Sequence, residues 1–294
     1  MKSEHLLVVD GNNLMHRSHH ALAGTGLTRV DGEPVWATHG MLMTLAKAVR
    51  ATGADRVVVA LDAPGGCPAR RSLLPGYKAN RSATVSTLAV QLYELPMLLE
   101  AAGLSAGVFP GWEADDVMAS LARWSTEAGM TCSVLTSDRD AYQLLSPTVQ
   151  VRKPNLELFD EQALLAKHGV TPAQYLQLAA LRGEPGDNID GVPGVGEKTA
   201  VKLLQAATDV ETLIADPERF RAVSPRGVSA VVEHAERVRR NMLVATLRRD
   251  LPVDLFAERG VLAGDVERLR ETLSKVGVPA AGRALAEAFT ARLS

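Results

Sequence analysis

Carboxylates stand where apolar runs of this sequence end, and that placement points to metal chemistry. Asp10 closes the run HLLVV, Asp62 closes RVVVAL, and Asp138 comes shortly after CSVLT. Carboxylates that gather at one edge of a sheet repel one another, so they ionise together only when cations lie between them. The sequence therefore predicts a metal-dependent enzyme.

Other acids extend this set. Three acids within four residues open the helical stretch of GWEADDVMASLA, and acids three apart on a helix share a face. A pair two residues apart in TSDRD can direct both carboxylates to one side of an extended segment. A last pair lies in RGEPGDN. The candidate metal ligands are Asp10, Asp62, Glu113, Asp115, Asp116, Asp138, Asp140, Glu184 and Asp187.

The number of acidic clusters indicates which chemistry they serve. Acids in a first helical turn also complement the helix dipole, but three in four residues favour a metal site. Together the clusters could hold two divalent ions roughly 4 Å apart, the arrangement that activates water in phosphodiester hydrolysis. Carboxylate oxygens favour Mg²⁺, with Mn²⁺ as a substitute, over zinc. We interpret His16, His19 and His20 as a solvated helix face.

A glycine-rich turn directly precedes a helix in GDNIDGVPGVGEKTAVKLL, residues 186–204. Such a turn exposes successive backbone N–H groups beside a helix N-terminus, which suits a phosphate. The spacing does not match a P-loop, and the alternative interpretation is a plain Gly/Pro turn between helices. The candidate phosphate-contacting residues here are Gly191, Val192, Gly194, Gly196, Lys198 and Thr199.

A basic stretch, ARRSLLPGYKANR, offers further contacts. Arg70, Lys78 and Arg81 can reach phosphates, and Tyr77 offers a ring face to a base or sugar. The formal net charge of −2 conceals segregation, because no acid lies between Ala63 and Tyr93 while arginines dominate residues 219–249. Separate acidic and basic stretches suit a protein that binds metals in one place and phosphates in another.

The elements that position these residues follow from the apolar pattern. Short β-branched runs such as VVVAL and CSVLT alternate with longer amphipathic stretches such as MLMTLAKAVRA. Continuous apolar strands that alternate with helices predict an α/β fold with a largely parallel sheet covered on both faces. Ligands collect beyond the carboxyl ends of such strands, where Asp10, Asp62 and Asp138 fall.

The strand pattern stops after about Pro172, and helical patterns follow. We therefore expect two domains, residues 1–180 as the metal-dependent α/β domain and residues 181–294 as a helical subdomain. Composition is ordinary for a globular protein, with 46% hydrophobic and 22% charged residues among 294. The first residues do not match a signal peptide, and no apolar run approaches the roughly 20 residues of a membrane span. Cys67 and Cys132 are expected to be reduced thiols.

With these elements in hand, the chain resembles the 5′ nuclease family, which includes the 5′→3′ exonuclease domain of bacterial DNA polymerase I and the flap endonucleases. The resemblance rests on VVDGNNLMHR, ALDAP, YKANR, EADDVMASLA, TSDRDAYQLL and GDNIDGVPGVGEKTA, and it covers about residues 5–250. It implies a PIN-like fold with a helix-three-turn-helix element, and cleavage of 5′ flaps and 5′ ends in DNA replication and repair. It also implies two Mg²⁺ ions and a K⁺ ion at the glycine-rich turn. Within that family, the chain resembles the stand-alone nucleases, in which no polymerase segment is joined to the nuclease domain.

The resemblance assigns roles to individual residues. A first metal cluster comprises Asp10, Asp62, Glu113, Asp115 and Asp116, and a second comprises Asp138, Asp140 and Asp187. Lys78 and Arg81 match basic residues that steer the scissile phosphate, and Arg70 matches an arginine that usually follows an aromatic. The sequence departs from the pattern at Ala69, where that aromatic is missing, and at Glu184, where the family has Asp.

The expected partners are DNA with a 5′ flap or 5′ end at a duplex junction, and also RNA–DNA primer junctions. No membrane partner is expected, and a monomer that is cytoplasmic and associated with the nucleoid is the default. Two other interpretations stay open. One is a PIN-type ribonuclease with the same acidic site, and the other is a non-catalytic protein that binds DNA junctions.

Overall fold

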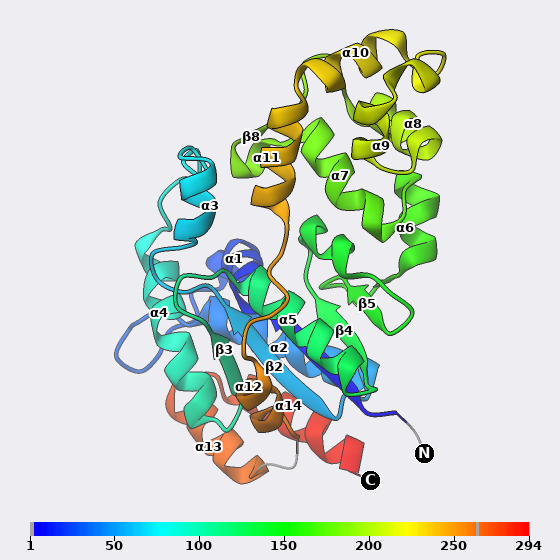
Figure 1. The fold of residues 1–294 in the computed structure, drawn as a ribbon. Helices are drawn as coiled ribbons and strands as arrows, with labels where there is room; N and C mark the ends of the chain where they lie inside the picture. The colour runs from blue at the N-terminus through cyan, green and yellow to red at the C-terminus, as the bar shows by residue number, and fades with distance from the viewer. Residues whose placement is uncertain (1–2, 263–264, 294) are drawn as a thin grey trace.

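Residues 3–262 and 265–293 are described by the computed structural model, and within them a six-stranded sheet lies at the centre with helices on both faces (Figure 1). The strand order is β3-β2-β1-β4-β5-β6. Neighbours from β3 to β5 pair in parallel, and β6 pairs antiparallel with β5. The predicted α/β fold is confirmed. The strands are β1 (His5–Asp10), β2 (Arg56–Leu61), β3 (Ser105–Val108), β4 (Thr131–Leu135), β5 (Val149–Arg152) and β6 (Leu158–Phe159).

The central strands are apolar at nearly every position because helices cover both faces of the sheet. Leu6 and Val8 of β1 face the layer that contains α5 (Ala114–Glu127). Leu7 and Val9 face the opposite layer, which contains α1 (Gly11–Leu22), α2 (Trp36–Thr52) and α4 (Ser86–Ala101). The expected solvated histidine face of α1 is only partly correct, since His19 is buried against Trp36.

A helical unit stands beyond the sheet, at the top of the view in Figure 1. It is built from α6 (Glu161–His168), α7 (Pro172–Arg182), α8 (Glu197–Ala207), α9 (Val210–Ala215), α10 (Pro225–Glu233) and α11 (Ala235–Ala245). A short hairpin of β7 (Gly183–Glu184) and β8 (Ile189–Asp190), which the sequence pattern did not predict, links α7 to the turn before α8. The expected boundary at residue 180 falls inside α7, so it needs correction.

The C-terminal helices do not belong to that helical unit, which corrects the expected subdomain of residues 181–294. After α11 the chain returns to the sheet as α12 (Asp254–Arg259), α13 (Val266–Lys275) and α14 (Pro279–Leu293). Leu273 and Leu285 are fully buried in the same core as α2. Amphipathic helices look alike in sequence whichever core they cover, so the pattern could not reveal this return.

Between α2 and α5 the chain forms a short helix, α3 (Pro68–Leu73), which lies near α11. Cys67 and Cys132 are buried free thiols, as expected. Over residues 3–262 and 265–293, no helix combines the length and apolar character that crossing a bilayer requires.

Candidate functional site

Acids gather at the carboxyl edge of the sheet, as the sequence predicted. Asp10 ends β1, where its carboxylate accepts hydrogen bonds from the Asn13 backbone N–H at 2.9 Å and the Thr136 hydroxyl at 2.7 Å. Asp62 follows β2 and accepts from the Ala114 N–H at 2.8 Å. The parallel register of β1 with β2 and β4 brings these strand ends side by side.

Five of these acids form what we call the open acid cluster. In the described part of the chain, no hydrogen bond or ion pair joins them to Lys, Arg or His. Each accepts hydrogen bonds only from neutral donors or from none, so Lys78 and Arg81 act on the cluster only through their charges at longer range. The cluster comprises Asp10, Asp62, Asp115, Asp138 and Asp140.

Burial and repulsion between carboxylates raise the pKa values of Asp10, Asp62, Asp115 and Asp140. Burial, with smaller contributions from the charges of Asp138 and Asp62, raises the pKa of Asp10 to about 7. Burial and then the charge of Asp138 raise the pKa of Asp140 to about 8. The pKa of Asp115 lies well above its ordinary value for the same two reasons. Cations placed among these oxygens would relieve the repulsion.

Asp116 lies in a different environment from the open acid cluster, and its assignment as a metal ligand stays a prediction. Its side chain is fully buried, and both oxygens accept hydrogen bonds of 2.7 Å from the guanidinium of Arg70. The backbone N–H groups of Arg248, at 2.8 Å, and Glu113, at 3.2 Å, donate to the same carboxylate. Four donors fill its acceptor positions, so Asp116 presents no oxygen to the open acid cluster.

Arg70 and Tyr77 also lie differently from the sequence interpretation. Arg70 is 5% exposed and Tyr77 is 7% exposed, so neither offers a surface to a phosphate or a base. The Tyr77 hydroxyl donates to Glu113 Oε2 at 2.8 Å, and Arg70 Nη1 donates to the same oxygen at 2.7 Å. The departure from the family pattern at Ala69 did not predict that Arg70 is buried, because burial of a charged side chain depends on partners elsewhere in the chain.

Glu113 is held by cations. Lys78 Nζ donates to its Oε1 at 2.7 Å. Burial alone would raise the pKa of Glu113, but the charge and hydrogen bond of Lys78, together with Arg70 and Tyr77, hold it below its ordinary value. Glu113 is therefore an ionised, fully partnered carboxylate beside the open acid cluster.

The basic loop that carries Lys78 and Arg81 is fastened to the hairpin of β7 and β8. Arg81 Nη2 lies 2.5 Å from Asp187 Oδ1, and the Lys78 N–H donates to the Asp187 carbonyl at 3.0 Å. The Asn188 side chain donates to the Gly76 carbonyl and the Asn80 side chain to the Pro185 carbonyl, both at 2.7 Å. Sequence reasoning missed both asparagines. The sequence signal for Asn188 was its place in GDN, because asparagine tolerates the left-handed backbone conformation that Asn188 adopts in this turn.

Glu184 lies in an ion-pair network. Its carboxylate pairs with Arg182, and its other oxygen lies 3.8 Å from Arg139 Nη2. Arg182 in turn reaches Glu197 at the start of α8, at 3.3 Å. Its assignment to the second metal cluster remains a prediction, although two guanidinium groups now compete for the carboxylate.

The glycine-rich turn lies directly before α8, as expected, but it follows the strand β8, which the sequence did not predict. Gly194 adopts a positive φ of 77°, and Gly196 and Lys198 are exposed. Val192 is 4% exposed, and its N–H donates to the Leu181 carbonyl at 2.8 Å, so it offers neither a side chain nor a free N–H to a phosphate. Arg237 Nη1 donates to the Gly191 carbonyl at 3.1 Å, and the expected K⁺ ion at this turn stays a prediction.

Within the described residues, no three acidic, histidine or cysteine side chains already surround one point as a set of metal ligands. The donor chemistry nevertheless fits Mg²⁺, since the open acid cluster supplies only carboxylate oxygens and lacks cationic partners.

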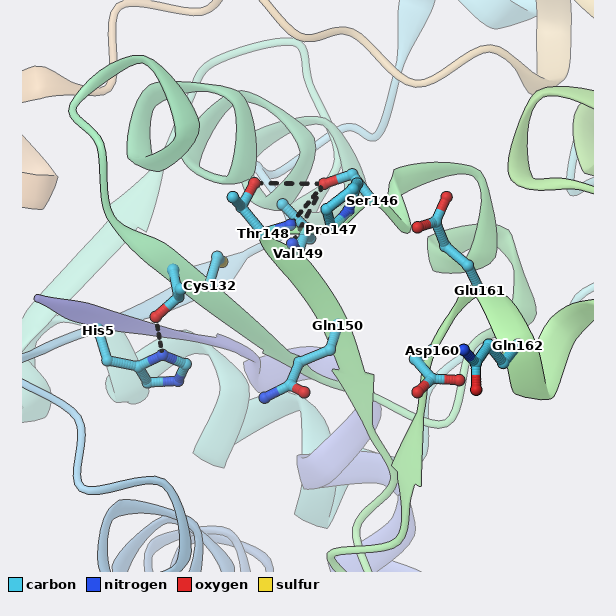
Figure 2. Close-up of a pocket in the computed structure, with 11 residues that line it drawn as sticks. His5, Cys132, Ser146, Pro147, Thr148, Val149, Gln150, Asp160, Glu161 and Gln162 are labelled. Atoms are coloured by element: carbon cyan, nitrogen blue, oxygen red, sulfur yellow. Dashed lines mark hydrogen bonds between the residues drawn. The ribbon is translucent and has the colours of Figure 1, made fainter. Parts of the chain in front are cut away.

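A cavity of about 390 Å³ opens at the opposite, amino edge of the sheet (Figure 2). Several of its polar lining groups are hydrogen-bonded within the protein. His5 Nδ1 lies 2.7 Å from Thr131 Oγ1, and Gln150 Nε2 donates to Ser133 Oγ at 2.9 Å. The cavity lies away from the acids, which follow the carboxyl ends of the same strands.

Comparison with protein families gives two adjoining matches. The 5′-3′ exonuclease N-terminal resolvase-like domain matches residues 5–169, and the 5′-3′ exonuclease C-terminal SAM fold matches residues 170–267. The chain is 38% identical over 273 residues to the thermostable DNA polymerase I of Thermus aquaticus, and 35% identical over 253 residues to DNA polymerase I of Mycobacterium bovis. These alignments cover 92% and 84% of the chain but only 32% and 28% of the polymerases. The chain thus spans about a third of the length of these relatives.

Solved structures share the fold over nearly the whole chain. T5 5′-exonuclease with bound zinc ions superposes with a TM-score of 0.64 at 21% identity, covering 99% of this chain and 98% of that one. The catalytic core of Rad2 in complex with DNA substrate superposes with a TM-score of 0.53 at 14% identity, covering 98% of this chain and 93% of that one.

Proposed function

The chain belongs to the 5′-3′ exonuclease family, and from that premise we propose that it hydrolyses DNA phosphodiester bonds at 5′ flaps and 5′ ends with two bound Mg²⁺ ions. The observation that carries the proposal is the open acid cluster at the carboxyl edge of the sheet, where no member is bonded to a protein cation and the pKa values of Asp10, Asp115 and Asp140 are raised. Mn²⁺ would substitute for Mg²⁺, because it prefers the same oxygen donors.

The residues proposed to hold the ions are the open acid cluster, with Asp187 at its border. Bound there, divalent ions lower the pKa of a water molecule and stabilise the leaving oxygen. Asp138 contributes the largest charge repulsion on both Asp10 and Asp115, so it lies central to the group. Glu113 is proposed to support the cluster from its side through Lys78 and Arg70.

Lys78 and Arg81 are proposed to contact the scissile phosphate. Both now pair with site carboxylates, Lys78 with Glu113 and Arg81 with Asp187. The Arg81 side chain is 52% exposed, so its guanidinium can turn toward a phosphate without crossing the core. Cations that are already positioned at the reacting centre neutralise charge at little cost in reorganisation.

The glycine-rich turn and the exposed side chain of Lys198 are proposed to bind the backbone of the duplex beside the site. Backbone contacts carry no sequence information, so selectivity would be for the shape of the junction. Affinity should fall as salt rises, because phosphate contacts release counterions. We propose a monomer that acts in replication and repair in the nucleoid, with RNA–DNA primer junctions among its substrates.

The test uses a flap substrate labelled at its 5′ end, with Mg²⁺ or with EDTA, and the variant Asp115→Asn. The matched control is Glu127→Gln, an exposed acid on the same helix that pairs with Arg123. We expect cleavage by the wild type and the control with Mg²⁺, and none with EDTA. Asp115→Asn should lose activity by a factor on the order of a thousand, as expected for losing an electrostatic contact made in the transition state.

The same assay separates the other interpretations. An RNA version of the flap that is cleaved faster than the DNA version would indicate a ribonuclease. Tight binding of the DNA flap without turnover at any Mg²⁺ or Mn²⁺ concentration would indicate a junction-binding protein. Cleavage that persists in EDTA would overturn the proposed metal dependence.

A further inference from the structure

We infer that Arg70 and Asp116 form a positioning pair, which fixes the acid cluster to the segment that leaves the helical unit. We call that segment, residues 244–251, the strap. The inference rests on the proposed function, since the geometry that the pair would fix is that of a nuclease site. It assigns Arg70 and Asp116 no contact with metal or phosphate.

Every N–H group of Arg70 has a partner. Nε donates to the Val244 carbonyl at 2.9 Å, and Nη2 donates to the Thr246 carbonyl at 3.2 Å. The remaining donors reach Glu113 and both oxygens of Asp116, each at 2.7 Å. A guanidinium with five donors in a rigid plane fixes the orientation of all its acceptors at once.

The strap is hydrogen-bonded to the sheet domain along most of its length. The Arg248 N–H donates to Asp116 at 2.8 Å, and Gln143 accepts from the Leu247 N–H at 3.1 Å and donates to the Ala245 carbonyl at 3.2 Å. Ser120 of α5 donates to the Arg248 carbonyl and accepts from the Leu251 N–H, both at 3.2 Å. Figure 1 shows the strap running from α11 past α5 to α12.

Through these hydrogen bonds, the guanidinium of Arg70 connects three parts of the molecule. Arg70 comes from α3 beside the basic loop, Asp116 from the helix that carries Asp115, and Val244 from the end of α11. Because α11 ends the helical unit that carries the proposed duplex-binding turn, the pair sets how far the bound duplex lies from the open acid cluster. That distance decides which phosphate reaches the metals.

The experiment compares Arg70→Lys and Asp116→Asn with Arg71→Lys, the neighbouring exposed arginine on the same helix. Gln143→Met removes strap contacts without touching an acid. For each variant, kcat and KM are measured on a DNA flap, product lengths are resolved to one nucleotide, and Mn²⁺ binding without DNA is measured by calorimetry. Circular dichroism establishes that each variant is folded.

For a positioning pair, Arg70→Lys and Asp116→Asn should lower kcat by a factor on the order of a hundred, as expected for a misplacement near 1 Å. KM for DNA should stay within about threefold of the wild type, since no uniform binding contact is lost. The number of bound Mn²⁺ ions should not change. Gln143→Met should spread the cut over neighbouring phosphates, and Arg71→Lys should match the wild type.

Loss of one bound ion in Asp116→Asn would overturn the inference, because it would make Asp116 a ligand. A rise in KM with unchanged kcat in Arg70→Lys would also overturn it, because it would make Arg70 a phosphate contact. Wild-type kinetics and cut position in all three variants would show that the pair positions nothing. A wild type that binds Mn²⁺ but cleaves no flap would instead refute the proposed function.

Discussion

A carboxylate at this sheet edge is ionised or protonated according to whether a cation reaches it. Glu113 has Lys78 and Arg70, and its pKa lies below the ordinary value, although burial alone would raise it. Asp115 bonds to neither; burial and the charges of Asp138 and Asp10 hold its pKa well above the ordinary value, although the charge of Lys78 lowers it. The sequence predicted that acids would gather here, because strand ends and spacing carry that information. It could not separate Asp115 from Asp116, because the difference lies in an arginine that is distant in the sequence.

The open acid cluster predicts how the metal-free protein responds to pH. Burial raises the folded pKa of Asp10 to about 7 and of Asp140 to about 8. A folded pKa above the unfolded value gives stability that is complete below the unfolded pKa of about 3.9 and is lost as pH rises through the folded pKa. In EDTA we therefore expect the midpoint temperature of thermal unfolding to decrease as the pH is raised from about 5 to about 8.

Differential scanning calorimetry across that pH range would measure the effect, with Asp10→Asn as the variant that flattens the slope. Added Mg²⁺ should raise the midpoint most at the alkaline end, where the carboxylates are ionised and bind it best. A midpoint in EDTA that rises steadily toward pH 8 would contradict the prediction.

Cys132 supplies a second residue-scale prediction. Its thiol is fully buried in β4, and burial raises its pKa to about 12. Since the thiolate is the reactive form, Cys132 should resist iodoacetamide at pH 7.5 while the protein is folded, and should react after denaturation. Peptide mass spectrometry after timed labelling would show this. Rapid labelling of Cys132 in the folded protein would mean that β4 opens more readily than its burial indicates.

At the scale of elements, long regular segments were predictable and short ones were not. The strands of the parallel sheet could be read from runs such as VVVAL, since burial on both faces makes them apolar throughout. The hairpin of β7 and β8 contributes two residues per strand, which is too short for any periodicity to appear. The strap has no periodicity at all, because its hydrogen bonds go to side chains of α3, α5 and Gln143.

Helix α9 offers a prediction about element boundaries. Asp209 caps it by accepting hydrogen bonds from the Thr212 N–H at 2.7 Å and hydroxyl at 2.8 Å, and these bonds lower its pKa. Asp209→Ala should destabilise the protein by about 1 kcal/mol at pH 7. Because the folded pKa is depressed, the capping contribution is present above the unfolded pKa and is lost as pH falls through the folded one.

Urea unfolding of Asp209→Ala and the wild type at pH 7 and near pH 3 would measure both effects. Asp216→Ala is a suitable control, since the structure gives the Asp216 side chain no capping hydrogen bond. A difference between wild type and Asp209→Ala that is the same at both pH values would show that the charge of Asp209 does not contribute.

At the scale of the whole molecule, the chain crosses between its two units more than once. Residues after α11 return to the sheet, where the Val57 N–H donates to the Gly260 carbonyl at 2.8 Å and α14 packs on α2. The matched family domains end at residue 267, so they leave out most of α13 and all of α14. Sequence patterns predicted helices here but not the partner they cover.

This return predicts that stability depends on the C-terminal helices. Leu285 of α14 is fully buried, so Leu285→Ala should cost about 2 to 5 kcal/mol through lost burial and the cavity it leaves. Leu255→Ala, at a site 52% exposed on α12, should cost far less. Guanidinium unfolding curves of both variants would measure the difference. Equal stabilities would mean that α14 does not share the core of the sheet domain.

The fastening of the basic loop to the β7–β8 hairpin has a mechanical consequence. With Gly76, Lys78 and Asn80 hydrogen-bonded to that hairpin, the far end of α3 is anchored and cannot swing freely. Helix α3 is also held at Arg70, which bonds Asp116 and the Val244 carbonyl. We therefore expect the movement that admits a strand end to lie in the irregular segment between Arg81 and α4. Any larger opening of α3 would first have to break the contact of Arg81 with the carboxylate of Asp187.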